Sequence, residues 1–123
     1  MIYKIALASS DGASIDSHFG AAERFYIAEL DTETEDCEIT GFRDVNRACH
    51  GGYHEIDAFA AILDTLSDVS AIVAQRVGPG ARKYISEHGI AVYQIALGTE
   101  QAICLLIEEK QWEVDKWLSH TKN

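Results

Sequence analysis

Apolar side chains gather in short runs along the first third of the chain, and these runs predict β-strands. Residues 2–8 are nearly all apolar, and residues 24–31 combine aromatic and β-branched side chains, which favour strands. A charged turn at 32–36 separates the second strand from a third at 37–44. The short connection predicts that the second and third strands form an antiparallel hairpin.

The rest of the chain alternates between helical and strand patterns. We expect helices at 53–66, at 81–88 and from Thr99 onwards, and strands at 69–74 and 90–95. The first helix has one apolar face, made by Ile56, Phe59, Ala60, Leu63 and Leu66. Thr99 is expected to cap the third helix. The apolar face of that helix contains Ile103, Leu106 and Ile107 and extends to Val114, Trp117 and Leu118.

The order of these elements is β-β-β-α-β-α-β-α. Strands that alternate with helices imply right-handed crossovers and parallel pairing, while the hairpin adds antiparallel strands. The pattern predicts an α/β fold with a mixed five-stranded sheet and helices on both faces, as in the ribonuclease-H-like architecture. We expect one domain over residues 1–123, with a core at about 2–108 and a helical tail at 109–123.

Composition and charge narrow the classes of function. The 123 residues carry a net charge of −10, which repels phosphate backbones and disfavours nucleic acid as a partner. No apolar run approaches the ~18 residues that span a bilayer, and the first residues do not form a secretory signal. Three widely spaced cysteines suit a reducing compartment. We therefore expect a cytoplasmic protein without a membrane partner.

The first candidate for chemistry is the polar segment 9–20, which follows the first strand. Its sequence, SSDGASIDSHFG, holds two aspartates, one histidine and a single aromatic residue. One interpretation is a structural turn, because Asp11-Gly12 favours turns and Asp and Ser side chains bond to their own backbone. The other is a site in which His18 is a metal ligand or proton donor and the loop amides hold an anion.

The second candidate is the segment 47–55, RACHGGYHE, just before the first helix. One thiol and two imidazoles, from Cys49, His50 and His54, are the ligand types that suit iron–sulfur species, zinc or copper. Gly51 and Gly52 let the backbone approach a ligand. A closed zinc site needs four ligands, and no second pair follows, so only an open or shared site fits. The alternative is a glycine-containing loop.

The third candidate is the segment 75–82, QRVGPGAR, between a strand and a helix. Its amides and the side chains of Arg76 and Arg82 could hold an anion. The segment lacks the motifs of nucleotide-binding loops, so the alternative is a tight turn. Two other cysteines are weaker candidates: Cys104 is expected to be a buried thiol on the third helix, and Cys37 has no assigned role. Carboxylates on strands, as a two-metal nuclease requires, are missing from strands one and four.

These segments resemble a known family. Residues 9–12, Ile15-Asp16, His18-Phe19-Gly20, Ala22 and 25–27 are similar to the opening of the dinitrogenase iron-molybdenum cofactor biosynthesis proteins, which include the NifX-type carriers and the C-terminal domain of NifB. The resemblance continues through Cys49, Gly51-Gly52, His54-Glu55 and residues 73–80 to Gly89-Ile90. It covers about residues 2–108, and it implies the ribonuclease-H-like fold.

The resemblance implies binding rather than catalysis: a nitrogen-fixation carrier that holds an iron–sulfur or iron–molybdenum cofactor, or its precursor, and passes it to assembly or acceptor proteins. Reversible binding of an anionic cluster needs few ligands and a cationic mouth. Cys49, His50, His54 and His18 would supply the metal ligands, beside Gly51 and Gly52. Arg47, Arg76 and Arg82 would supply the charge.

Two rival functions remain open at this point. The chain could be a regulatory or adaptor protein that acts through protein contacts and has a vestigial pocket. It could also be a metal-assisted hydrolase that uses His18, or a Cys49 nucleophile, although no base with an orienting partner is evident from the spacing.

Overall fold

The computed structural model describes residues 2–45 and 55–109. The strands are β1 (Ile2–Ala8), β2 (Arg24–Asp31), β3 (Cys37–Asp44), β4 (Ala71–Ala74) and β5 (Ala91–Gln94). The helices are the short 3₁₀ turn η1 (Phe19–Ala21), α1 (Glu55–Thr65), α2 (Pro79–Glu87) and α3 (Thr99–Glu108). All five strands form one sheet in the order β3-β2-β1-β4-β5. β1 pairs antiparallel with β2 and parallel with β4, which confirms the predicted mixed sheet.

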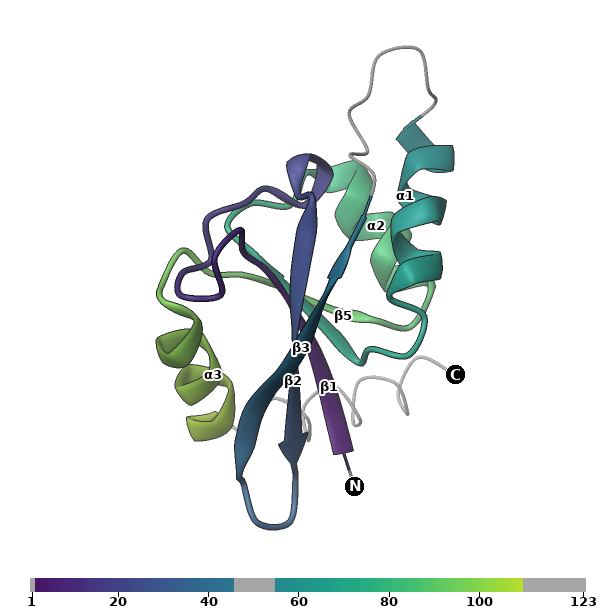
Figure 1. Ribbon diagram of the computed structural model, residues 1–123. Coiled ribbons are helices and arrows are strands. Elements are labelled where there is room, and N and C mark those ends of the chain that lie inside the picture. The colour runs from purple at the N-terminus through teal and green to yellow at the C-terminus, as the bar shows by residue number, and fades with distance from the viewer. Residues whose placement is uncertain (1, 46–54, 110–123) are drawn as a thin grey trace.

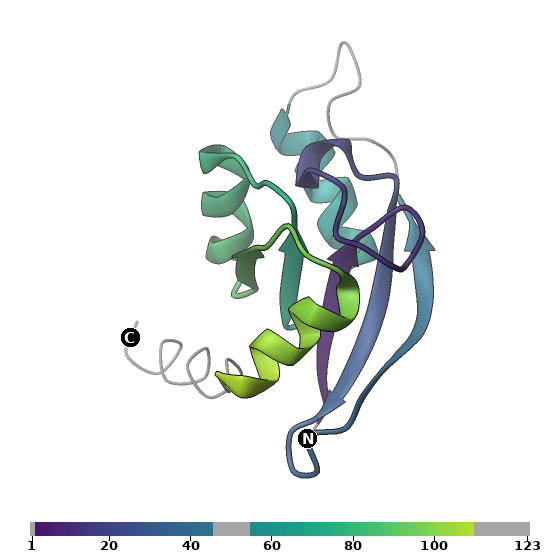
Figure 2. The ribbon, with the colours of Figure 1, turned by 90° about the vertical axis from the view of Figure 1, so that its left-hand side faces the viewer.

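The helices cover both faces of the sheet, as predicted. α1 and α2 pack on one face and α3 packs on the other (Figures 1 and 2). Side chains of β1 alternate between the two faces: Tyr3, Ile5 and Leu7 contact the α3 side, whereas Ala6 and Ala8 contact the α1 side. β4 is buried along its whole length, as expected of a strand that is covered on both faces.

The bounds of the elements agree closely with the sequence pattern. β1, β2 and β3 begin and end where the pattern placed them, and β4, α2 and β5 shift by one or two residues. The N-cap of α3 is Gly98 rather than Thr99, which is the first residue of the helix. Residues 110–123, with Val114, Trp117 and Leu118, lie outside the described residues. No described helix is long and apolar enough to cross a membrane.

The prediction that Cys104 is buried was wrong, because its thiol is exposed. The buried side of α3 is formed by Thr99, Ala102, Ile103 and Leu106. With about 100° of rotation per residue, position 104 lies roughly 150° from the centre of that side. Cys37 is half-buried at the start of β3, and desolvation raises the pKa of its thiol to about 11.

Asp68 fastens the C-terminal end of α1 to the sheet. Its carboxylate accepts hydrogen bonds from Arg43 at 2.5 and 2.9 Å and from Lys4 at 2.9 Å. Arg43 Nη1 also donates to the carbonyl of Thr65, at 2.9 Å. Arg43 first, and Lys4 second, hold the pKa of Asp68 well below its usual range. These bonds hold the C-terminal end of α1 against β1, through Lys4, and β3, through Arg43.

Phe19 joins the loop after β1 to the hydrophobic core. Its ring is fully buried, and its centroid lies 5.7 Å from that of Phe59 on α1 and 6.1 Å from that of Phe25 on β2. Tilted aromatic pairs at these distances are favourable beyond the area they bury. The only aromatic residue of the segment 9–20 therefore anchors it.

We predict that Phe19→Ala lowers the free energy of unfolding by about 3–5 kcal/mol, because it leaves a cavity between β2 and α1. Urea denaturation followed by circular dichroism measures the loss. The control is Leu97→Ala, at a side chain that is 44% exposed, for which we expect a loss of about 1 kcal/mol or less. Equal effects of the two substitutions would show that Phe19 is not an anchor.

Candidate functional site

The first half of the segment 9–20 is a hydrogen-bonded turn built on Asp11. One carboxylate oxygen of Asp11 accepts from the amides of Ala13 at 2.8 Å and Ser14 at 3.3 Å, and these bonds hold the pKa of Asp11 below its usual value. Gly12 has a φ of +79°, and a Cβ there would meet the ring of Tyr26 at 3.0 Å. The predicted turn is confirmed, and its glycine is required on both grounds.

The second half of the segment is held by Asp16. Its carboxylate accepts from the amide of Ser10 at 3.0 Å, from the Ser10 hydroxyl at 2.5 Å and from the Ser17 hydroxyl at 2.9 Å. Burial raises the pKa of Asp16, but the bonds from Ser10 and Ser17 outweigh it, and the pKa lies below its usual value. The charged carboxylate therefore ties the two ends of the loop together.

Backbone hydrogen bonds join the first candidate segment to the third. The amide of Gln75 donates to the carbonyl of Ser17 at 2.9 Å, and the amide of Phe19 donates to the carbonyl of Arg76 at 2.9 Å. His18 and Arg76 thus form a short parallel bridge beyond the ends of β1 and β4. Phe19 points into the core while His18 stays exposed. The structure therefore brings two of the three predicted segments together.

The third segment itself is a tight connection into α2. Gly78 is the N-cap and Pro79 begins the helix, as the alternative interpretation of a βα turn predicted. The amide of Val77 donates to the side-chain carbonyl of Gln94 at 3.1 Å, which secures the turn to β5. Arg76 and Arg82 are both exposed, so their charges face solvent at this end of the sheet.

Residues 47–54 of the second candidate segment lie outside the described residues, and its last residue, Glu55, begins α1. The segment holds six of the predicted site residues: Arg47, Cys49, His50, Gly51, Gly52 and His54. The described residues on either side of it can be placed. Val45, which follows β3, donates its amide to the carbonyl of Glu23 at 2.9 Å. Glu23 lies between η1 and β2, and α1 begins at this same end of the sheet (Figure 1).

The predicted metal-ligand set stays a prediction. Within residues 2–45 and 55–109, no three His, Cys, Asp or Glu side chains gather in a way that could hold a metal ion. His18 is the one proposed ligand in the described part of the chain. It lies at the loop end of the sheet, where the other proposed ligands are attached through Val45 and Glu55.

A link from α3 to the loop was missed in the sequence. The Thr99 hydroxyl, which is buried, donates to the carbonyl of Gly12 at 2.7 Å, and the Thr99 amide donates to the carbonyl of Ala13 at 2.9 Å. The amide of Ile15 donates to the carbonyl of Leu97 at 2.8 Å. The threonine at the helix start, which pattern alone assigns to a cap, instead fixes a loop 86 and 87 residues away.

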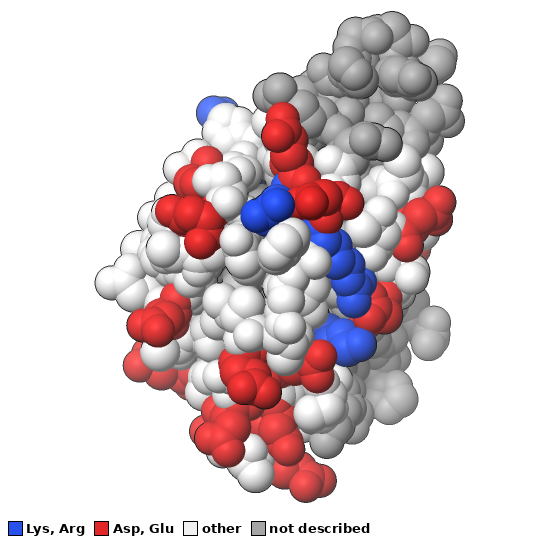
Figure 3. All heavy atoms as spheres, viewed as in Figure 1, with Lys and Arg blue, Asp and Glu red and all other residues white. Residues whose placement is uncertain are grey.

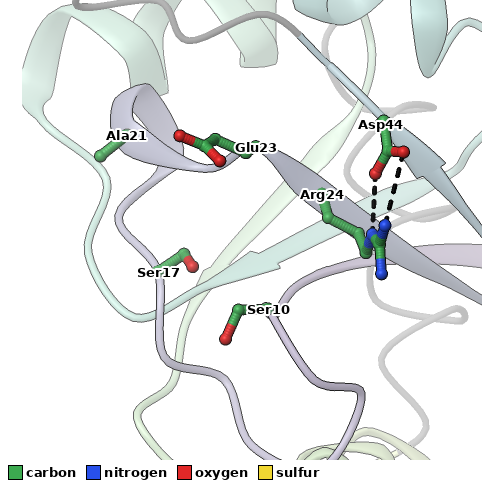
Figure 4. A pocket seen from close by; sticks show the side chains of 6 residues that line it. All are labelled: Ser10, Ser17, Ala21, Glu23, Arg24 and Asp44. Carbon is green, nitrogen blue, oxygen red and sulfur yellow. Dashed lines mark hydrogen bonds and ion pairs between the residues drawn. The ribbon is translucent and has the colours of Figure 1, made fainter.

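A pocket of about 380 Å³, also missed, lies beside this loop and is lined by Ser10, Ser17, Ala21, Glu23, Arg24 and Asp44 (Figure 4). Arg24 points at Asp44 across the strand pair, with Nε 2.7 Å from the carboxylate, and its guanidinium lies 3.8 Å from the centre of the Phe42 ring. Arg24 is thus committed to Asp44, and the two serine hydroxyls donate to Asp16. The wall is acidic and offers mainly acceptors, unlike the predicted cationic mouth.

Comparison with known proteins shows the family. The family model described as dinitrogenase iron-molybdenum cofactor matches residues 1–109. The chain belongs to this family.

The similar proteins include long and short members. The chain is 31% identical over 87 residues to the FeMo cofactor biosynthesis protein NifB of Sinorhizobium fredii, an alignment that covers 71% of the chain and 17% of that protein. It is 31% identical over 110 residues to the uncharacterized protein MJ0580 of Methanocaldococcus jannaschii, which covers 89% of both. The chain therefore spans about a sixth of the NifB protein (17%) but nearly all of MJ0580.

Two solved structures show that the fold is shared. The apo form of the orange protein from Desulfovibrio gigas matches with a TM-score of 0.63 and 21% identity, over 89% of this chain and 90% of that one. The protein PH0822 matches with a TM-score of 0.64 and 17% identity, over 86% of this chain and 91% of that one.

We predict that Asp16→Asn weakens the pH dependence of stability. The pKa of Asp16 in the folded protein lies below its ordinary value near 3.8, so its contribution is present above that value and is lost as the pH falls through the folded-state pKa. Urea midpoints at about pH 7 and about pH 3 should show the variant less stable than the parent at the higher pH, with a smaller difference between the two at the lower pH. Asp36→Asn, at an exposed aspartate in the β2–β3 turn, is the control and should follow the parent. An equal deficit of Asp16→Asn at both pH values would contradict the assignment.

Proposed function

We propose that this chain is a carrier that binds an iron–sulfur cluster or an iron–molybdenum cofactor, or a precursor of either, and passes it to assembly or acceptor proteins in the cytoplasm. Membership of the family and similarity to NifB proteins support the cofactor class. The proposal contains no catalytic step. On the strand order, we also assign the sheet to the ribonuclease-H-like topology.

The observation that carries the proposal is the bridge between His18 and Arg76. Through this bridge the exposed His18 lies beside the β4–α2 turn. This is also the end of the sheet at which β3 ends and α1 begins, on either side of residues 46–54. A cargo held there would meet His18 from one loop and the proposed ligands Cys49, His50 and His54 from another. Thiolate and imidazole are suitable ligands for iron and other soft metals.

Charge favours one side of this loop end for an anionic cargo. Glu23, Arg24 and Asp44 line the pocket beside β2 and β3. Arg24 is paired with Asp44, so the lining has an excess of one negative charge, from Glu23, which disfavours an anionic cluster. Arg76 and Arg82 are exposed on the side of the β4–α2 turn, where the first amides of α2 also favour negative charge. We therefore place the cargo on the side of His18 that faces this turn, with Arg47 as a further cation and Gly51 and Gly52 allowing close approach. A small number of protein ligands would keep such a cargo exchangeable.

The test is an anaerobic titration of the apo-protein with ferrous iron and sulfide, in which binding is measured by the charge-transfer absorbance of the bound iron. We expect the parent to develop the absorbance and the Cys49→Ala/His54→Ala double variant to lose it. His18→Ala should weaken binding by about tenfold or more, the scale of losing one coordinating or orienting partner at a metal site.

The matched control is His88→Ala. His88 is also an exposed histidine, but it lies at the C-terminal end of α2, where its ring contacts the carbonyl of Tyr84 at 2.8 Å. It should leave the titration unchanged. Absence of binding by the parent, or binding that ignores all three loop ligands, would refute the carrier. Protein partners that a pull-down retains after loss of these ligands would then favour the adaptor function.

A further inference from the structure

β3 is an edge strand, and among residues 2–45 and 55–109 no other strand pairs with its outer side. It is the first strand of the sheet, it pairs with β2 alone, and none of its eight residues is buried. In Figures 1 and 2 no described helix or strand lies across this edge. An open edge presents unpaired backbone donors and acceptors to any other strand.

Two large apolar side chains are exposed on this strand and share one face. Ile39 is 39% exposed and Phe42 is 50% exposed. They share a face because Thr40 is an extra residue: Ile27 pairs with Gly41, whereas its neighbour Ala28 pairs with Ile39. Such a bulge shifts the alternation of side chains by one position, so residues 39 and 42 point the same way. Figure 3 shows an uncharged area on this side of the molecule, next to a diagonal series of basic side chains with acidic ones beside them.

Two of the devices that usually protect an edge strand are missing from β3. Natural edges carry charged side chains, lysine above all, or proline, or a bulge that twists the edge away, and of these β3 has the bulge at Thr40. β3 has the sequence CEITGFRD, without lysine or proline, and its Glu38 and Arg43 have opposite charges. They stand at equal distances from the middle of the strand, as do Ile39 and Phe42.

We propose that β3 is a dimer interface, at which a second copy of this chain adds its own β3 in antiparallel register about a two-fold axis between Thr40 and Gly41. In this register Ile39 of one copy faces Phe42 of the other, and this apolar pair occurs twice. A two-fold interface must be self-complementary, and the apolar pair meets this condition. Arg43 stands opposite Glu38 in the same register, but its guanidinium is bonded to Asp68 of its own copy, so the apolar contacts carry the interface. Because the bulge at Thr40 lies next to the two-fold axis in each copy, Ile39 and Phe42 of both copies lie on the same face of the joined sheet.

The dimer would join two five-stranded sheets into one sheet of twice that number. Antiparallel pairing points the loop ends of the two copies in opposite directions, so neither copy covers the other's His18. The interface is therefore separate from the proposed cargo site, and the two proposals can fail independently.

The test uses Ile39→Lys and Phe42→Glu, two substitutions at exposed positions that leave the core intact. Sedimentation equilibrium over a dilution series should show a dimer for the parent. In each variant the dissociation constant should rise by about tenfold, because an apolar cross-strand contact is lost twice per dimer. Circular dichroism checks that both variants are folded. Leu97→Lys, at a 44% exposed leucine away from β3, is the matched control and should dimerise as the parent does.

Mixing the two variants tests the register itself. In a heterodimer of Ile39→Lys with Phe42→Glu, the lysine faces the glutamate across one half of the interface, and the native Phe42 faces the native Ile39 across the other. We expect the mixture to dimerise when neither variant does so alone. A parent that is monomeric throughout, single variants that dimerise normally, or a mixture that stays monomeric would each overturn the proposal.

Discussion

Two backbone hydrogen bonds between the loops that follow β1 and β4 are the constraint on which the loop end of this molecule depends. The amides of Gln75 and Phe19 donate to the carbonyls of Ser17 and Arg76, and so extend the parallel pairing of the two strands beyond the sheet. The same segment is anchored by Phe19, which is buried between β2 and α1. His18, the residue before this anchor, is exposed, so its backbone is held between the bridge to Arg76 and the core.

The loop is held from two further directions. Asp11 and Asp16 organise it from within, through bonds to nearby amides and hydroxyls, while Thr99 holds it from α3. A loop held in this way presents its exposed side chains, such as that of His18, from a fixed backbone. The pocket lined by Glu23, Arg24 and Asp44 and the exposed arginines of the β4–α2 connection, Arg76 and Arg82, belong to different elements around this loop.

Features that depend on neighbouring residues were predictable from the sequence, and features that depend on distant ones were not. The β2–β3 hairpin and the Asp11-Gly12 turn follow from local alternation and turn chemistry. The bond from Thr99 to Gly12 joins residues that are distant in sequence, and no spacing rule indicates it. The ion pair of Arg24 with Asp44 was predictable, because the two residues stand opposite each other at the open end of the predicted hairpin. The error at Cys104 has a geometric cause, because a short helix that covers one side of a sheet buries only a narrow stripe. The ligands of the second segment lie outside the described residues, and their role rests on the chemistry of their side chains.

The most direct test of the central claim, that this loop end holds a metal cluster, is the iron and acid-labile sulfide content of the protein purified without oxygen. We expect both elements to accompany the parent protein in a fixed ratio and to be lost together from the Cys49→Ala/His54→Ala variant. Iron and sulfide that are absent from the parent, or equally present in the variant, would contradict it.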